Sequence, residues 1–114
     1  ACFGLSYKAD SNDLRESPAM EITVNLAKKS NLKIFIVEPY IEKLPFPLAR
    51  FSNVFLANID DAISQSKIIL LLTDHKVFKE IDAKKIKTKF LIDTRGIWNL
   101  PHSTKEKSSY KSKI

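Results

Sequence analysis

Residues 1–38 read ACFGLSYKADSNDLRESPAMEITVNLAKKSNLKIFIVE and contain the pattern that decides the fold. Apolar runs at 1–6 and 32–38, rich in branched residues, are typical of buried strands. Between them Ser17 is a suitable helix cap, Pro18 suits a first helical turn, and apolar residues follow at helical spacing. A strand, a helix of about 13 residues and a strand form a crossover unit, which is right-handed in almost every parallel sheet.

The rest of the chain repeats this alternation. Short helices are predicted from Asp60 and over 76–87, the second broken near Asp82, whereas the prolines of 39–52 predict a loop or irregular turns. Further apolar runs lie at 53–57, which is the weakest, 67–73 and 89–94. The sequence therefore predicts an α/β fold, a Rossmann-like three-layer domain with a mainly parallel sheet of about five strands.

Length and composition limit the protein class. The chain has 114 residues, 44% of them hydrophobic, which fits one globular domain. Its apolar runs are shorter than the roughly 20 residues that span a bilayer, so no membrane partner is expected. The single cysteine suits a reducing cytoplasm, and within an apolar strand Cys2 is more plausible as a small hydrophobic residue than as a nucleophile. The absence of a signal-peptide pattern and a start inside a strand indicate a fragment.

The basic balance divides into two parts. The net charge is +6, of which residues 102–114 contribute four lysines and one glutamate (+3), and residues 1–101 contribute fifteen basic and twelve acidic groups (+3). We expect a domain over 1–100 and a polar basic tail over 101–114 that is disordered. A basic nucleic-acid-binding module stays open as an alternative, although aromatic residues do not alternate with the basic ones as stacking would require.

Candidate site residues follow from the predicted topology. In open parallel sheets, ligands bind beyond the carboxyl ends of the strands. Lys8 and Arg15 lie in the loop that enters the first helix, where free backbone N–H groups favour an anion, and Arg95 follows the last strand. We expect these cations to converge at one sheet edge, where a phosphate-bearing ligand would bind. Alternatively, Lys8 and Arg15 only pair with carboxylates on an exposed loop; the candidates are Asp10, Asp13 and Glu16.

Other site types have weaker signals. A dinucleotide site would need a G-x-G-x-x-G turn, but only Gly4 is present, and Glu38 is interpreted as a capping or loop-fixing residue. His75 is expected to be a hydrogen-bonded structural residue. With His102 it does not form metal-ligand spacing, so no metal is expected. Two aromatic residues are expected to pack under the last loops, namely Phe78 and Trp98.

Several motifs together resemble a known family. GLSYK at 4–8, followed by NDLRESPA at 12–19, resembles the opening of the UDP-binding C-terminal domain of the UDP-glucose/GDP-mannose dehydrogenase family. The resemblance covers about residues 1–99 and continues through Val37-Glu38-Pro39, Thr73-Asp74-His75 and Asp93-Thr94-Arg95-Gly96-Ile97-Trp98. His75 and the Gly-Ile-Trp ending are similar to the UDP-N-acetylmannosamine dehydrogenases within the family.

The resemblance implies an NAD-dependent UDP-sugar 6-dehydrogenase with three parts. An N-terminal domain would bind most of the NAD, a central segment would carry the catalytic cysteine and form a homodimer, and this domain would close over the UDP-sugar. The enzyme would oxidise the C6 alcohol of UDP-N-acetylmannosamine to the uronic acid, for surface polysaccharide precursors. The catalytic cysteine is not in this chain, so the chain alone is expected to be inactive.

The resemblance also implies roles for individual residues. Tyr7 and Lys8 would contact the nucleotide-sugar, with the Lys8 ammonium as a point charge. Arg95 would meet the nucleotide from the last strand, and Arg15 would reach the cofactor side of the closed cleft. No catalytic or metal-binding residue is expected here. The alternatives to this UDP-sugar-binding function are a stand-alone dinucleotide-binding domain and the nucleic-acid-binding module, although no nucleic acid is expected as a partner.

Overall fold

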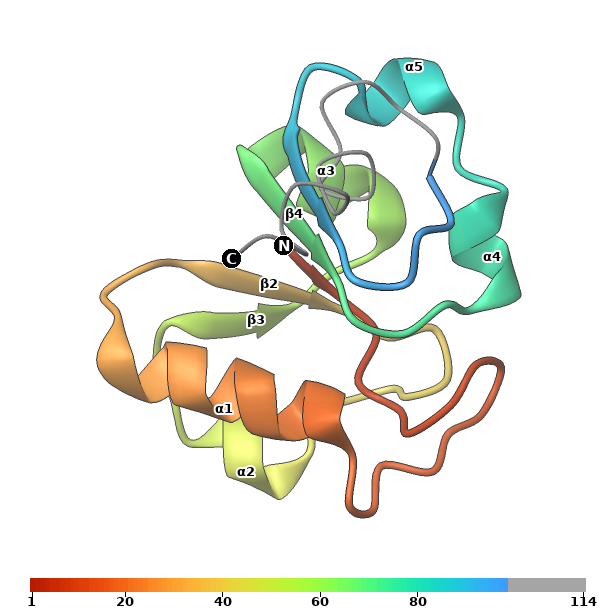
Figure 1. The fold of residues 1–114 in the computed structure, drawn as a ribbon. Coiled ribbons are helices and arrows are strands. Elements are labelled where there is room, and N and C mark those ends of the chain that lie inside the picture. Colours follow the sequence, from red (N-terminus) through yellow and green to blue (C-terminus); the bar gives the residue numbers. More distant parts are fainter. Residues whose placement is uncertain (99–114) are drawn as a thin grey trace, which may run out of the picture.

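The computed structural model describes residues 1–98, in which a five-stranded sheet lies between two helical layers (Figure 1). The strands are β1 (Cys2–Phe3), β2 (Ile34–Val37), β3 (Val54–Leu56), β4 (Ile68–Leu71) and β5 (Phe90–Asp93). The helices are α1 (Pro18–Lys29), α2 (Phe46–Ala49), α3 (Ile59–Gln65), α4 (Lys76–Lys79) and α5 (Ala83–Ile86). The strand order is β3-β2-β1-β4-β5 and every neighbouring pair is parallel, which confirms the predicted α/β class. The tail predicted at 101–114 lies outside the described residues.

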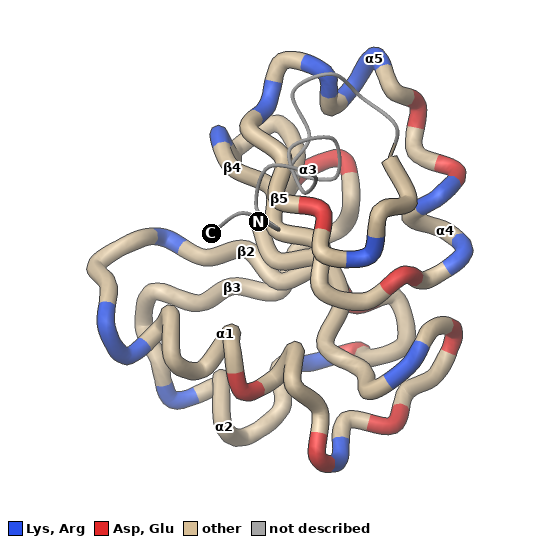
Figure 2. The backbone as a smooth tube through the Cα atoms, viewed as in Figure 1, with Lys and Arg blue, Asp and Glu red and all other residues tan. Residues whose placement is uncertain are grey.

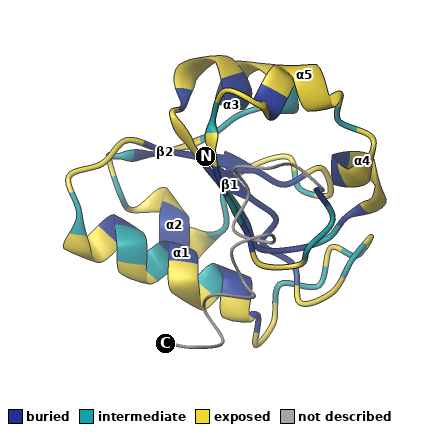
Figure 3. Cartoon of the chain, turned by 45° about the horizontal axis from the view of Figure 1, so that its top comes forward, coloured by how far each residue is buried: buried dark blue, intermediate teal, exposed yellow. Residues whose placement is uncertain are grey.

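Both faces of the sheet are covered, because strand residues alternate between two apolar clusters. In β2, Ile34 and Ile36 pack in the cluster that includes Ala19 of α1, whereas Phe35 and Val37 pack in the opposite one. Figure 1 shows α1 and α2 on one side of the sheet, with α3, α4 and α5 on the other. Figure 3 shows the buried strands between helices whose outer surfaces are exposed. This is the predicted three-layer arrangement.

The first crossover unit forms as the sequence predicts. The Ser17 hydroxyl accepts a hydrogen bond from the Met20 N–H at 3.3 Å and caps α1, which begins at Pro18. The predicted break near Asp82 is also present, because the Asp82 carboxylate accepts from the Lys84 N–H and starts α5 as a separate helix. The first strand is shorter than the predicted 1–6, since the chain turns at Gly4.

Among the described residues, none of the helices is long and apolar enough to cross a membrane. The central position of β1 in the sheet has a functional consequence. The loops that follow β1, β4 and β5 leave from the same edge, because parallel strands end on the same side. The predicted site residues are carried by these loops.

Candidate functional site

The site begins at a turn that requires glycine. Gly4 has φ +100°, a value that side chains disfavour, and a Cβ added there would lie 2.4 Å from the Cβ of Thr73. The chain thus passes directly over the end of β4. The Gly4 N–H donates to the Val37 carbonyl at 2.9 Å, which keeps the turn against the end of β2.

The backbone after Gly4 is held at almost every polar group. The Leu5 and Ser6 N–H groups donate to Glu38 Oε1 at 2.8 and 3.2 Å. The Leu5 carbonyl accepts from the Ser17 hydroxyl at 2.6 Å, and the Ser6 carbonyl accepts from the Thr73 hydroxyl at 3.0 Å. The Ser6 hydroxyl in turn donates to the Lys8 carbonyl at 2.7 Å. Residues 5–8 therefore have a backbone that is fixed before any ligand binds.

Glu38 is the main acceptor in this arrangement, as its predicted loop-fixing role requires. Besides the two N–H groups of the loop, Oε1 lies 2.9 Å from His75 Nε2, and Oε2 accepts from the Tyr40 N–H at 3.1 Å. Burial alone would raise the pKa of this carboxyl, but the hydrogen bonds from His75, Leu5 and Tyr40 outweigh burial and lower the pKa below its usual value. Glu38 thus stays ionised at neutral pH while only 3% exposed.

The part of the loop that follows Lys8, called its outer end below, is held through Asp10. Its N–H donates to His75 Nδ1 at 2.8 Å, and its carboxylate accepts from the Lys76 N–H at 2.8 Å and from the Tyr40 hydroxyl at 3.4 Å. The backbone of Asp10 has φ +57°, a conformation that aspartate tolerates better than most residues. His75 is fully buried and hydrogen-bonded on both ring nitrogens, which confirms its predicted structural character.

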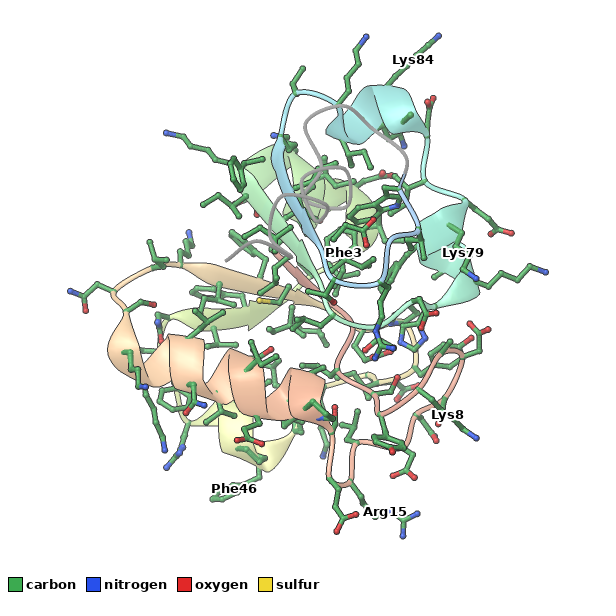
Figure 4. The ribbon with its side chains drawn as sticks, viewed as in Figure 1. Phe3, Lys8, Arg15, Phe46, Lys79 and Lys84 are labelled. Atoms are coloured by element: carbon green, nitrogen blue, oxygen red, sulfur yellow. The ribbon has the colours of Figure 1, made fainter. Side chains whose placement is uncertain are left out.

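Tyr7 and Lys8, the two residues of this loop that are predicted to contact the ligand, lie between the segment bonded to Glu38 and the segment bonded to His75. Tyr7 is 56% exposed and the Lys8 side chain projects into solvent from the loop between β1 and α1 (Figure 4). The Tyr7 N–H is bonded to the Asp13 carbonyl at 2.9 Å, so the ring leaves a backbone that is already in place. The loop carries charges of both signs, as Figure 2 shows, and Lys8 contributes one of its two positive charges.

Arg15 is placed differently from the expectation. Its guanidinium forms two hydrogen bonds to Asp13, with Nε 3.0 Å from Oδ1 and a terminal nitrogen 3.1 Å from Oδ2. The Arg15 side chain is 88% exposed, and Figure 4 shows it pointing outward from the loop instead of toward Lys8. Its hydrogen bonds lower the pKa of Asp13 to about 2. In this conformation Arg15 has the carboxylate partner that the alternative interpretation gives it.

Arg95 lies at the same sheet edge as Lys8. The Asp93 carboxylate accepts from the N–H groups of Arg95, Gly96 and Trp98 at 3.1, 2.6 and 2.8 Å, which shapes the turn after β5. The Arg95 Nε then donates to the Leu72 carbonyl at 3.2 Å. Because Leu72 follows β4, which pairs directly with β1, this bond directs Arg95 from the outer strand toward the centre of the edge. The structure thus places Lys8 and Arg95 on one edge, with Arg15 turned outward.

Residues 1–100 match the model described as the UDP-glucose/GDP-mannose dehydrogenase family, UDP binding domain. The chain belongs to this family. The predicted resemblance is therefore confirmed, and so is the similarity to UDP-N-acetylmannosamine dehydrogenases, because relatives of that name match the chain.

Two curated relatives and one solved structure illustrate the match to the dehydrogenase family. The NDP-N-acetyl-D-galactosaminuronic acid dehydrogenase of Ralstonia nicotianae is 42% identical over 99 residues, which are 87% of this chain and 23% of the relative. The UDP-N-acetyl-D-mannosamine dehydrogenase of Escherichia coli is 38% identical over 98 residues, covering 86% and 23%. The structure of the S. aureus UDP-N-acetyl-mannosamine dehydrogenase superposes with a TM-score of 0.68 at 24% identity, covering 90% of this chain and 23% of that one, and supports the fold. This chain thus spans about a quarter of the length of these dehydrogenases.

A separate groove of about 790 Å³ lies beyond the ends of β2 and β3 in this dehydrogenase domain. Its apolar wall includes Ile41 and Leu56, and its rim includes Asn58, Asp60 and Asp61. Asp60 is paired with Lys85 at 3.0 Å, and Asp61 adds a second carboxylate to the lining. Lys8 and Arg95 lie elsewhere on the same sheet edge, on the loops after β1 and β5.

Three further predictions concern residues outside the edge. Cys2 is buried in β1, where burial raises the pKa of its thiol, so it is a protonated core residue at neutral pH. Phe78 and Trp98 are buried, and the Trp98 indole N–H donates to the Phe78 carbonyl at 2.9 Å. Both aromatic residues are packing residues, as predicted. Within residues 1–98, no cluster of three or more potential metal-ligating side chains occurs.

Sequence reasoning did not assign two positioning groups, Ser6 and Asp93. The Ser6 hydroxyl fixes the carbonyl of Lys8, and the Asp93 carboxylate shapes the Arg95 turn. Both are short polar residues: Ser6 lies three residues after β1, at the end of the predicted strand 1–6, and Asp93 ends β5, which was the available signal. Their partners depend on side-chain directions that the sequence pattern does not contain.

Proposed function

We propose that this chain recognises the nucleotide diphosphate of a UDP-sugar at the edge formed by the loops after β1, β4 and β5. Tyr7, Lys8 and Arg95 would contact the ligand, and Arg15 would face the cofactor side of the closed cleft. The observation that supports this most is the fixed backbone of residues 5–8, which presents Tyr7 and Lys8 at the edge that Arg95 also reaches. A preformed backbone that presents Lys8 reduces the ordering that binding must overcome.

The role of Arg15 rests on the family resemblance, because its side chain is not turned toward Lys8. Its guanidinium faces solvent on the outer side of the loop. Two hydrogen bonds to Asp13 hold the Arg15 guanidinium in one orientation without burying it. We infer that Arg15 contacts a group presented from outside this domain, namely the cofactor side of the site.

A dinucleotide does not fit the chain in the usual way. The first turn has only one glycine, and the Leu5 that follows is fully buried. An acidic residue after the second strand binds ribose in dinucleotide folds, but both oxygens of Glu38 already accept internal hydrogen bonds. We therefore infer that NAD is bound mainly by an N-terminal domain beyond this chain.

The whole enzyme would be an NAD-dependent UDP-sugar 6-dehydrogenase. It would oxidise the C6 alcohol of UDP-N-acetylmannosamine in the cytoplasm, to supply surface polysaccharide precursors, and would form a homodimer. The support is the 38% identity to the Escherichia coli enzyme of that name. The 42% identity to a galactosaminuronic acid dehydrogenase makes a second N-acetylated sugar the natural comparison substrate.

Calorimetric titration with UDP tests this function, using Lys8→Ala and the matched variant Lys84→Ala. Figure 4 shows Lys84 on α5, far from Lys8, so its removal changes the net charge equally without touching the edge. We expect weak UDP binding by the chain, reduced about tenfold by Lys8→Ala because one charge-assisted contact is lost. Lys84→Ala should leave it unchanged.

Three other outcomes would contradict the function. Equal weakening in both lysine variants would indicate a nonspecific charge effect. Binding of NAD in the absence of UDP binding would favour a dinucleotide domain, and steeply salt-dependent binding of an oligonucleotide would favour a nucleic-acid-binding module.

A further inference from the structure

We propose that His75 is a positioning residue for the ligand-binding loop, acting through the backbone of Asp10 to hold Tyr7 and Lys8 in place. The inference rests on the proposed function, because it assigns a second role to the same edge. His75 does not itself lie at the surface, since it is fully buried.

The hydrogen bonds define the tautomer of His75. The Asp10 backbone N–H can only donate, so Nδ1, at 2.8 Å, is an acceptor without a proton. The ring proton of the neutral imidazole is then on Nε2, which lies 2.9 Å from Glu38 Oε1. The ring is thus fixed by a donor on one side and an acceptor on the other. Its faces and edges are also enclosed, with the Tyr40 and Phe78 ring centroids at 5.0 and 5.2 Å.

The two ends of the loop are held by different side chains. Glu38 binds the N–H groups of Leu5 and Ser6 at the beginning, whereas His75 binds the N–H of Asp10 at the outer end. Tyr7 and Lys8 lie between these two anchors. Because His75 follows β4, its bond joins the loop to a second strand end, across a sequence separation of 65 residues.

Asp10 strengthens the outer anchor with its side chain. Its Oδ1 accepts from the Lys76 N–H at 2.8 Å, directly beside His75 in the sequence. The carboxylate and the amide of one residue are therefore both bonded to the segment between β4 and α4. Loss of either bond would free the outer end of the loop, and Lys8 would then lose conformational entropy on binding.

Two substitutions of His75 separate the contact at Nδ1 from those at Nε2, which also lies 3.3 Å from the Ser6 hydroxyl. His75→Asn keeps an acceptor near the Nδ1 position and loses the donor to Glu38, whereas His75→Gln keeps a donor near Nε2 and loses the acceptor for Asp10. In the 114-residue chain we would measure {1H}–15N heteronuclear NOE values for the Tyr7 and Lys8 amides, and UDP affinity by NMR titration. We expect lower NOE values and about fivefold to tenfold weaker UDP binding for His75→Gln, the size of one lost hydrogen bond. His75→Asn should retain most of both.

The matched control is Ile69→Val, which removes a buried methylene in β4 without touching the loop. It should lower stability and leave the NOE values and UDP affinity unchanged. Equal effects in the two His75 variants, or effects matched by Ile69→Val, would overturn the positioning role. So would a folded His75→Gln chain with wild-type NOE values and affinity.

If His75→Gln does not fold, Asp10 provides a surface test of the same anchor. Asp10→Gly suits the positive φ and removes the carboxylate that binds Lys76, whereas Asp10→Asn keeps an oxygen acceptor. Only Asp10→Gly should lower the NOE values and the affinity; wild-type values would overturn the inference. The NOE measurement needs no ligand and therefore tests the role of His75 separately from UDP binding. If the NOE values fall in His75→Gln but Lys8→Ala binds UDP like the wild type, the proposed function is refuted and the positioning role of His75 stands.

Discussion

Single residues determine where the loop between β1 and α1 lies. Gly4 allows close contact with Thr73, and Glu38 collects the N–H groups of the next two residues. The sequence predicted Glu38 and His75 as structural residues from their positions at strand ends. It could not predict that Asp10 is bonded to His75 and Asp13 to Arg15. That pairing depends on a loop conformation with φ +57° at Asp10.

Gly4 provides a direct stability prediction. Gly4→Ala should destabilise the chain by about 2–4 kcal/mol, because the new methyl group meets Thr73 and the backbone keeps a positive φ. Urea denaturation measures this loss as a lower midpoint with an unchanged slope. An unfolding midpoint equal to that of the wild type would show that the turn does not approach Thr73 as described.

Glu38 predicts how stability depends on pH. Its pKa is lowered in the folded chain, so the unfolded carboxyl, with a pKa of about 4.3, binds a proton more readily. The contribution of Glu38 is therefore fully present above about pH 4.3 and is lost as the pH falls through the folded pKa. At pH 7, Glu38→Gln should cost about 2 kcal/mol in urea denaturation.

The difference between the wild type and Glu38→Gln should shrink below about pH 4. Glu42→Gln, an exposed change on the loop after β2, is the matched control and should stay close to the wild type throughout. A constant difference from pH 7 to pH 3 would contradict the assigned role of the carboxylate.

At the scale of elements, the periodic signals were sufficient for most of the fold. Branched apolar runs predicted the five strands, Ser17 predicted the start of α1, and the break predicted near Asp82 separates α4 from α5. The first strand was predicted too long because Leu5 and Ser6 are buried like strand residues, although Glu38 and not a neighbouring strand binds their N–H groups. Burial without strand pairing has no distinct signature in sequence.

Helix capping gives a prediction at this scale. Ser17 caps α1 and also donates to the Leu5 carbonyl, within a buried environment, whereas Asn58 caps α3 at the surface. Ser17→Ala should cost about 2 kcal/mol and Asn58→Ala about 1 kcal/mol in urea denaturation, because only the first leaves a buried carbonyl without its donor. Equal costs would show that the bond to Leu5 adds nothing to capping.

For the whole molecule, topology separates two regions beyond the carboxyl ends of the strands. The loops after β1, β4 and β5 place Lys8 and Arg95 on one edge, and the groove beyond β2 and β3 carries Asp60 and Asp61. Family membership was predictable from the motifs, whereas the outward direction of Arg15 required the structure. Under the proposed function, a diphosphate would bind the first region, where Lys8 and Arg95 lie.

The most direct measurement is a 1H–15N NMR titration of the chain with UDP. We predict that chemical shift changes concentrate on the amides of Tyr7, Lys8, Arg95 and Gly96, and that they saturate together. Changes concentrated instead on residues 58–61, with the amides of Tyr7 and Lys8 unaffected, would contradict this prediction.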